Sequence, residues 1–194
     1  MLFATAKGAV LSALAAQASA KTIKIAVGKD GLTFTPDSVT ASQGDVLEYH
    51  FYKQHSVAMG DFSNGCAPAP QGGFFSGVVK TAGDGANKQV FQVTVNNTDP
   101  MAVYCTVGRH CQNGMVHVVN PSSTNSLDTY KSVSNSAGAN VAPPTMFGGK
   151  MVESAGASGT ASSAQSKTTG AASHMQASLR GISAAALGFA VLLL

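Results

Sequence analysis

The sequence lacks several patterns that mark common classes of protein. Between residues 21 and 121 the charges of the two signs balance, positive at Lys21, Lys24, Lys29, Lys53, Lys80, Lys88 and Arg109 and negative at Asp30, Asp37, Asp45, Glu48, Asp61, Asp84 and Asp99. A nucleic-acid-binding domain carries a basic patch, so this class is excluded. There is also no glycine-rich phosphate loop, Ser/His/Asp set or catalytic carboxylate pair. We therefore expect a protein that is not an enzyme.

A long apolar period of 3.6 residues, which would indicate helices, is missing as well. Instead, apolar residues alternate with polar ones over short stretches, beginning with Ile23, Ile25 and Val27 and continuing at Leu47, Tyr49 and Phe51 and at Phe91, Val93 and Val95. Such alternation is typical of strands with one buried face, and glycine and proline separate the stretches. The patterned part, residues 21–121, is predicted to be a single all-β domain, a sandwich or small barrel.

The first 20 residues have the features of a signal peptide. Lys7 precedes an apolar run at 9–16, and small residues follow at Ala18-Ser19-Ala20. The run is too short and too interrupted for a transmembrane helix. We predict that residues 1–20 are removed on secretion.

The other end of the chain resembles a signal for a glycolipid (GPI) anchor. Small residues at 170–172 are followed by a mostly polar spacer and then by an apolar tail from Ile182 to Leu194. This order is the anchor pattern, whereas a tail anchor would be longer. We predict attachment at Gly170, removal of residues 173–194, and a cell-surface location at the outer leaflet or in the cell wall.

Residues 122–172 differ in composition from the part before them. They are rich in Ser, Thr, Gly and Ala, with Tyr130 and Phe147 as their aromatic residues. A segment with so little apolar surface is predicted to be a disordered, O-glycosylated stalk. Asn96-Asn97-Thr98 is an acceptor sequence for an N-linked glycan at Asn96.

The most informative segment runs from Cys105 to Met115. It contains a thiol at Cys105, an imidazole at His110 and a thioether at Met115, with four residues between each and the next. Two histidines, a cysteine and a weak axial methionine form the ligand set of type 1 (blue) copper sites. His55 is the best upstream candidate for the second histidine. Strand-like residues before and after the segment predict that it is the turn of a hairpin.

Two other interpretations of these residues stay open. Buried cysteine and methionine often serve only to fill a core. Zinc would use a tetrahedral cysteine and histidine set drawn from His55, Cys66, Cys105, His110 and Cys111. Copper is favoured because the segment has no CxxC pair and includes a methionine at a suitable position.

Three cysteines leave one thiol without a disulfide partner in a secreted chain. If Cys105 binds metal, Cys66 and Cys111 remain to pair. The pairings Cys66–Cys105 and Cys105–Cys111 would destroy the proposed site, and the residues alone do not decide among the three.

Longer motifs resemble the cupredoxins. The run Phe34-x-Pro36-x-x-Val39-x-Ala41-x-x-Gly44-Asp45-x-Leu47-x-Tyr49-x-Phe51, followed by His55-Ser56-Val57, is similar to the front half of such a domain. The run from Tyr104-Cys105 through His110-Cys111 to Met115 is similar to the back half in plant phytocyanins and in fungal cell-surface cupredoxins with a serine-rich tail. Gly72-Gly73-Phe74-Phe75-Ser76-Gly77 and Asn120-Pro121 resemble the fungal group especially.

The resemblance implies a Greek-key β-sandwich over residues 21–121 with one copper ion near one end. By matching position, the copper ligands are His55, Cys105, His110 and Met115, and the disulfide is Cys66–Cys111. Arg109 stands where many relatives have glycine, and this cation is expected to raise the reduction potential or change the choice of partner.

The resemblance also implies one-electron transfer with a redox partner that the sequence does not identify. Two alternatives are copper binding or buffering outside the cell, and a structural cell-wall protein in which the metal is incidental and cell-wall glycans are the partners. An oxidase is disfavoured because the His-x-His motif of multicopper oxidases is absent from the sequence.

Overall fold

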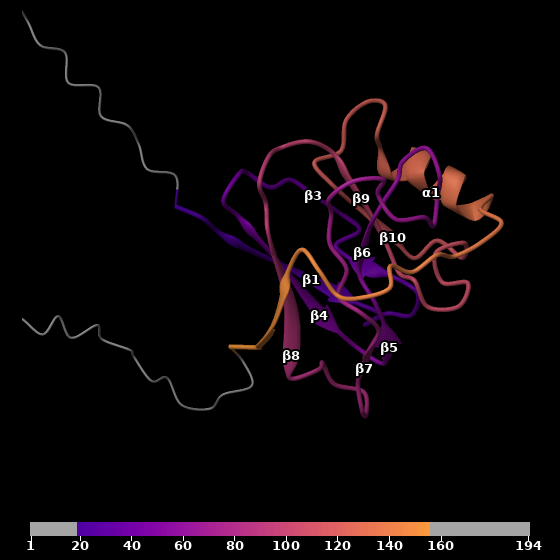
Figure 1. Ribbon diagram of the computed structural model, residues 1–194. Coiled ribbons are helices and arrows are strands. Elements are labelled where there is room, and N and C mark those ends of the chain that lie inside the picture. The colour runs from indigo at the N-terminus through magenta and orange to yellow at the C-terminus, as the bar shows by residue number, and fades with distance from the viewer. Residues whose placement is uncertain (1–18, 156–194) are drawn as a thin grey trace, which may run out of the picture. The chain divides into compact units, whose positions relative to one another are not determined.

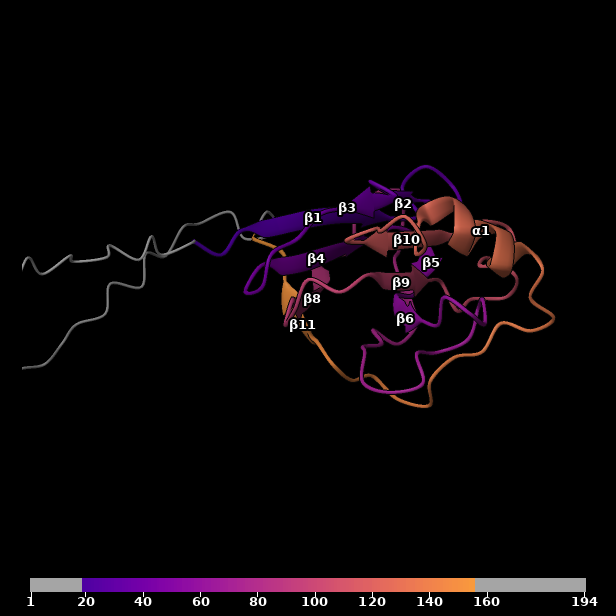
Figure 2. The same cartoon turned by 90° about the horizontal axis from the view of Figure 1, so that it is seen from above.

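Two β-sheets face each other across the main apolar core in the computed structural model, which describes residues 19–155 (Figures 1 and 2). The first sheet has the order β11 (Lys150–Glu153), β8 (Gln89–Thr94), β4 (Val46–Phe51), β1 (Thr22–Val27) and β2 (Phe34–Thr35). The second has the order β3 (Ser38–Val39), β10 (Val116–Val119), β9 (Met101–Tyr104) and β6 (Ala58–Gly60). A small third sheet joins β5 (Gln54–His55) to β7 (Val79–Lys80), and α1 covers Leu127–Asn135.

The strand pairing gives a Greek-key arrangement. The parallel partner of β1 is β4, and β3 pairs in parallel with β10, which lies far along the chain. Both pairs require the chain to cross between the sheets, whereas β9 and β10 form an antiparallel pair joined by the segment from Cys105 to Met115. The predictions of an all-β sandwich and of a hairpin turn at this segment are confirmed.

The predicted alternation places its apolar side chains in the core between the sheets. Leu47, Tyr49 and Phe51 are fully buried, and Ile25 and Val27 of the neighbouring strand join them. Apolar burial of this kind contributes about 25 cal/mol per Å² and fixes the register of β1 on β4. The position of His55, only four residues beyond Phe51, follows from that register.

The predicted disorder from residue 122 onward is wrong for residues 122–155. Ser126 caps α1, because its Oγ accepts a hydrogen bond from Thr129 N at 3.1 Å. Such a cap stabilises a helix by about 1 kcal/mol. Farther on, β11 adds to the edge of β8 in antiparallel register. The ordered domain therefore extends past the predicted boundary at 121.

A second apolar cluster explains why this extension folds. It lies on the outer face of the second sheet, where α1 packs beside β10 (Figure 2), and comprises Ala58, Cys66, Phe75, Ala102, Tyr104, Cys111, Val116, Val118 and Tyr130. Tyr130 of α1 is fully buried and meets Phe62 edge-on at 5.5 Å between ring centroids. The sequence held an indication of this cover, since three of the four residues of Val116–Val119 are valines, on both faces of the strand, and all four residues are buried. Such a run is typical of a strand buried on both faces.

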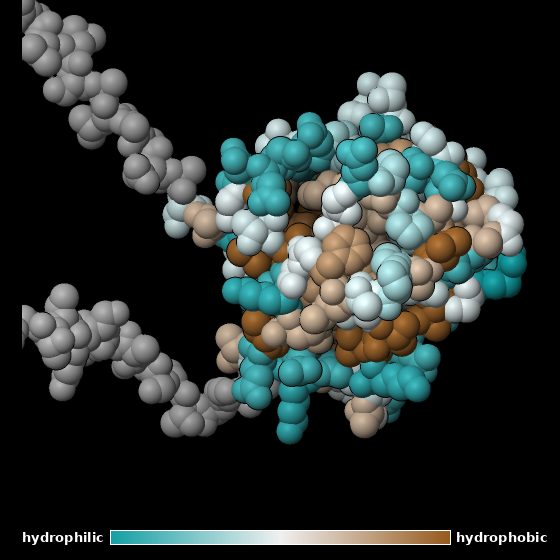
Figure 3. Space-filling model, viewed as in Figure 1, coloured by the Kyte–Doolittle hydropathy of each residue, from teal (hydrophilic) through white to brown (hydrophobic). Residues whose placement is uncertain are grey.

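The remaining predictions about the ends of the chain concern parts that the structure does not describe. These are the signal peptide up to residue 18, the stalk beyond residue 155, Gly170 and the anchor signal at 173–194. Within residues 19–155, no helix has the length and hydrophobicity needed to span a membrane. On the face shown in Figure 3, hydrophobic residues lie in small groups between hydrophilic ones.

Candidate metal centre

His55 is placed by β5 and by a close approach of the end of β1. It pairs with Val79 across the small sheet, and its side chain is buried. The backbone of Gly28, at φ +80°, passes so near the imidazole that a Cβ there would lie 2.0 Å from His55 Cδ2. Only glycine leaves room for the ring, and only glycine adopts this φ without strain. The orientation of His55 thus depends on a residue 27 positions earlier.

The segment between β9 and β10 places Cys105 and His110 on the same side of a tight turn. Cys105 directly follows β9, and its N–H donates to Met115 O at 3.2 Å. His110 N donates to Val107 O, and Met115 N donates to His110 O, both at 2.9 Å. Gly108 and Gly114 supply the positive φ angles that the turn requires.

Three ligand atoms converge at this turn. The Cys105 sulfur lies 3.8 Å from His55 Nδ1 and 3.5 Å from His110 Nδ1. One ligand atom from each residue falls within 4.8 Å of the others. Two imidazole nitrogens and one thiol, gathered this closely, fit a trigonal His2Cys copper site. The fold therefore brings together three of the four donors predicted from the sequence.

Electrostatics prepare the two histidines to act as neutral ligands. Burial, reinforced by electrostatic repulsion from Lys53 and from the His110 ring when it is protonated, lowers the pKa of His55 to about 4. Burial also lowers the pKa of His110. Both rings therefore keep a free nitrogen lone pair at neutral pH.

Cys105 is fully buried, and this burial raises the pKa of its thiol. Hydrogen bonds from Val107 and Ser56 act in the opposite direction. A buried thiol of this kind loses its proton when a cation replaces it. The site is thus more suited to a metal than to a free thiolate.

Ser56 links the two parts of the site, and the sequence reasoning gave it no role. Its Oγ lies 3.8 Å from the Cys105 sulfur and 2.8 Å from Thr106 Oγ1, and it accepts a hydrogen bond from Thr106 N at 2.8 Å. Ser56, which follows His55, therefore holds Thr106, which follows Cys105. All three polar groups are buried, where such bonds are costly to break.

Asn140 holds the ligand turn from outside, and sequence reasoning missed it because it lies in the predicted stalk. Its Nδ2 donates to Cys105 O at 3.1 Å and to Gly108 O at 2.9 Å. The segment is fixed by its neighbour, since Val141 N donates to Cys66 O at 2.9 Å and Val141 O accepts from Tyr104 Oη at 2.5 Å. The extension after residue 121 is thus part of the metal centre's support.

Cys66 and Cys111 form the disulfide, as the resemblance implied, with 5.8 Å between their Cα atoms. Cys105 is the free cysteine among residues 19–155. The zinc set suggested by the sequence is not assembled, because two of its five members are joined to each other. The disulfide ties the residue next to His110 to the segment after β6.

Met115 and His117 are both buried in the domain, at positions that only the structure reveals. Met115 is fully buried and belongs to the same core cluster as Cys105. His117 is not among the residues that converge at the metal centre. It is fully buried, 5.7 Å from Phe34 and 6.1 Å from Tyr49 between ring centroids.

The approach of Gly28 to His55 gives a testable prediction. Gly28→Ala is expected to displace the imidazole of His55 and to weaken copper binding by more than about 100-fold. This is more than the loss caused by removing a residue that only supports a metal ligand. Gly31→Ala is the matched control, since Gly31 also has a positive φ of +89° but a Cβ there meets nothing within 4 Å. Copper titration of both variants separates the steric effect from backbone strain. Equal affinities would contradict the role given to Gly28.

Asn140→Ala is expected to loosen the ligand turn, because two carbonyl groups lose their donor. We expect copper affinity to fall by about 10- to 100-fold and unfolding free energy to fall by about 1–3 kcal/mol. Asn135→Ala in the same extension is the control, since Asn135 is exposed at the end of α1. Copper competition assays and chemical denaturation measure the two effects. A loss of stability with unchanged affinity would make Asn140 merely structural.

Comparison with known proteins gives two related sequences. A protein of Arthroderma benhamiae named "Probable GPI-anchored cupredoxin-1" is 36% identical over 157 residues, which cover 79% of this chain and 81% of that protein. A second protein of that organism, "Extracellular serine-rich protein", is 40% identical over 121 residues, covering 61% of this chain but only 47% of its own length. No family model matches the chain.

Several solved structures are also similar to parts of the chain. Auracyanin A of Chloroflexus aurantiacus, described as a "blue" copper protein, is 17% identical with a TM-score of 0.37, covering 50% of this chain and 95% of its own. A mutant fern plastocyanin is 19% identical with a TM-score of 0.35, covering 50% of this chain and 97% of its own. Pseudoazurin of Methylobacterium extorquens is 19% identical with a TM-score of 0.35, covering 57% of this chain and 82% of its own.

Proposed function

Because this chain belongs to the cupredoxin family, we propose that it is a cell-surface type 1 copper protein that transfers one electron at a time. The observation that carries the proposal is the convergence of His55, Cys105 and His110, with one ligand atom from each within 4.8 Å of the others. When bound, copper would supply a one-electron couple between its two common oxidation states.

The chain's own residues would hold the ion and limit movement around it. His55 and His110 would each supply a nitrogen, Cys105 a thiolate sulfur and Met115 a weakly bound thioether sulfur. The hydrogen bond from Ser56 restrains the Cys105 sulfur, and the disulfide at Cys111 restrains the backbone next to His110. A site that cannot rearrange favours rapid electron exchange, since little reorganisation accompanies the change of charge.

Electrons would enter and leave through His110, the most exposed of the three ligands. With His55 it lines a shallow depression of about 300 Å³, whose other residues are Gly31, Leu32, Lys53 and Gln54. Arg109 is exposed beside it. A cation at this edge stabilises the form of the site with less positive charge, so we propose that Arg109 raises the reduction potential.

We further propose that the protein acts outside the cell and is held there by a GPI anchor at Gly170. The order of small residues, spacer and apolar tail supports this, as do the names of the two relatives, one "GPI-anchored" and one "Extracellular". The disulfide is also suited to an oxidising compartment.

Extracellular copper buffering is the second candidate, because the same donor set would serve it. Copper(II) titration of the full chain, followed by visible absorption, EPR and voltammetry, tests both. Intense blue absorption, narrow copper hyperfine splitting and a reversible one-electron wave are expected. Tight copper(I) binding without a reversible wave would favour buffering. A colourless adduct with broad splitting would contradict the type 1 site.

A further inference from the structure

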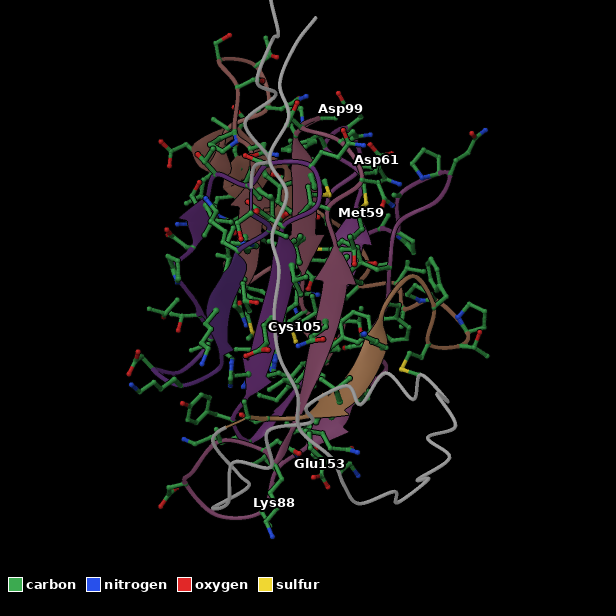
Figure 4. All side chains as sticks on the ribbon, turned by 90° about the vertical axis from the view of Figure 1, so that its left-hand side faces the viewer. Met59, Asp61, Lys88, Asp99, Cys105 and Glu153 are labelled. Atoms are coloured by element: carbon green, nitrogen blue, oxygen red, sulfur yellow. A yellow bond between two sulfur atoms is a disulfide. The ribbon has the colours of Figure 1, made fainter. Side chains whose placement is uncertain are left out.

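A pocket of about 270 Å³ lies apart from the metal centre, and none of the metal ligands lines it. Its walls come from the segment 71–74, the end of β8, the turn at 96–100 that follows β8, and the start of β9. In the view of Figure 4, Asp99 lies near the top and Met59 below it; both line the pocket, and both lie above Cys105.

The pocket combines an apolar floor with a rim of amide and carboxylate groups. Met59, Phe74, Val93 and Met101 contribute the floor, and Gln71, Asn96, Asn97 and Asp99 contribute the rim. A sugar with an N-acetyl group matches this mixture, because it presents a methyl group and C–H faces together with hydroxyl groups. Apolar contact with a few placed polar groups is the usual composition of a small-molecule site.

The rim includes the acceptor of the chain's Asn-x-Thr sequence. Asn96 and Thr98 are exposed, so a sugar on Asn96 meets no obstruction from the fold. The neighbouring Asn97 is occupied, since its Oδ1 accepts a hydrogen bond from Asp99 N at 3.1 Å and stabilises the turn. The side chain of Asn96 itself is exposed and is the one available for a glycan.

Two glycines bring the walls of this pocket together. A Cβ on Gly73 would lie 3.1 Å from Met59 Cβ, and one on Gly148 would lie 2.1 Å from Gly73 O. Both residues have positive φ, at +87° and +68° respectively. Gly148 belongs to the extension after residue 121, so the extension contributes part of the wall of this pocket.

We propose that Asn96 carries an N-linked glycan and that its first N-acetylglucosamine residues lie in this pocket. The donor is an oligosaccharide linked to a lipid diphosphate: the amide nitrogen of Asn96 bonds to the sugar's C1 and loses a proton, and the bond from C1 to the diphosphate oxygen breaks, releasing the lipid diphosphate. The attached sugar then covers the apolar floor formed by Met59 and Met101. The inference rests on passage through the secretory pathway, which is part of the proposed function.

Methionine oxidation provides a direct test, because sulfoxide formation follows exposure of the thioether. The full chain is produced in a yeast secretory host as wild type, Thr98→Ala and Thr98→Ser. Thr98→Ala removes the acceptor sequence and leaves Asn96 unchanged, whereas Thr98→Ser retains it. Intact mass before and after endoglycosidase treatment reports occupancy, and peptide mapping after dilute peroxide reports the oxidation rate of each methionine.

We expect a glycan on wild type and Thr98→Ser, with Met59 and Met101 oxidised about threefold faster in Thr98→Ala. Met146, which is 50% exposed and outside the pocket, should oxidise at one rate in all three. A glycan with unchanged rates at Met59 and Met101 would overturn its seating in the pocket. Secreted, disulfide-bonded protein without a glycan on Asn96 would overturn the modification and leave the proposed copper function intact.

Discussion

Cys105→Ser is expected to abolish the blue copper centre while leaving the fold in place. A serine hydroxyl stays protonated at neutral pH and cannot provide the thiolate bond on which intense visible absorption depends. Copper affinity should fall by more than about 100-fold, because removing a residue that only supports a metal ligand already costs up to about 100-fold. Visible and EPR spectra of the copper-treated variant measure the loss.

The structure indicates why this substitution should be tolerated by the fold. Ser56 Oγ lies 3.8 Å from the Cys105 sulfur, so a hydroxyl there has a polar neighbour. The disulfide between Cys66 and Cys111 is not involved. Retained blue absorption in Cys105→Ser would remove Cys105 from the site.

Met115→Leu is the companion variant to Cys105→Ser. It keeps an apolar side chain of similar volume, which cores tolerate well, and should retain intense absorption with a changed reduction potential. An unchanged potential would argue against axial ligation by Met115.

Truncation after residue 121 is expected to be the most damaging change to the fold. The fragment 21–121 loses α1, β11 and the Asn140 contacts, and it uncovers the outer face of the second sheet. Loss of a buried aromatic residue such as Tyr130 alone costs about 3–5 kcal/mol, against a total stability of about 5–15 kcal/mol for a typical domain. We expect no cooperative thermal unfolding from this fragment, and cooperative unfolding from fragment 21–155. Circular dichroism during heating measures both.

Tyr130→Ala within fragment 21–155 separates the packing contribution from the rest of the extension. Tyr130 meets Phe62 edge-on and is fully buried, so its removal should destabilise by about 3–5 kcal/mol. Equal melting temperatures for fragments 21–121 and 21–155 would show that the extension contributes nothing to stability.

Much of the metal centre was predictable because its residues are local. Cys105, His110 and Met115 lie on one short segment, and the strand-like residues on both sides indicate a hairpin. The alternating pattern at Leu47, Tyr49 and Phe51 likewise reflects a strand with one face in the core. In each case the information lies within a dozen residues, where side-chain periodicity and turn residues determine the structure.

The extension was predicted wrongly because composition averages over a segment. Residues 122–155 are mostly small and polar, yet Tyr130 and the Ser126 cap are enough to anchor α1 on a sheet that needs a cover. The run Val116–Val119, which has valines on both faces of the strand, was the indication that such a cover exists. Whether a polar segment is ordered depends on the surface against which it packs, and the composition of the segment gives no information about that surface.

The sequence by itself determined the strands, the ligand turn and the donor types that suit copper. Only the tertiary structure decided how they meet: Gly28 against His55, Asn140 on the Cys105 and Gly108 carbonyls, and Gly148 against Gly73. These contacts join residues far apart in the chain, so neither periodicity nor spacing encodes them. They arise where the two sheets and the extension pack closely against one another.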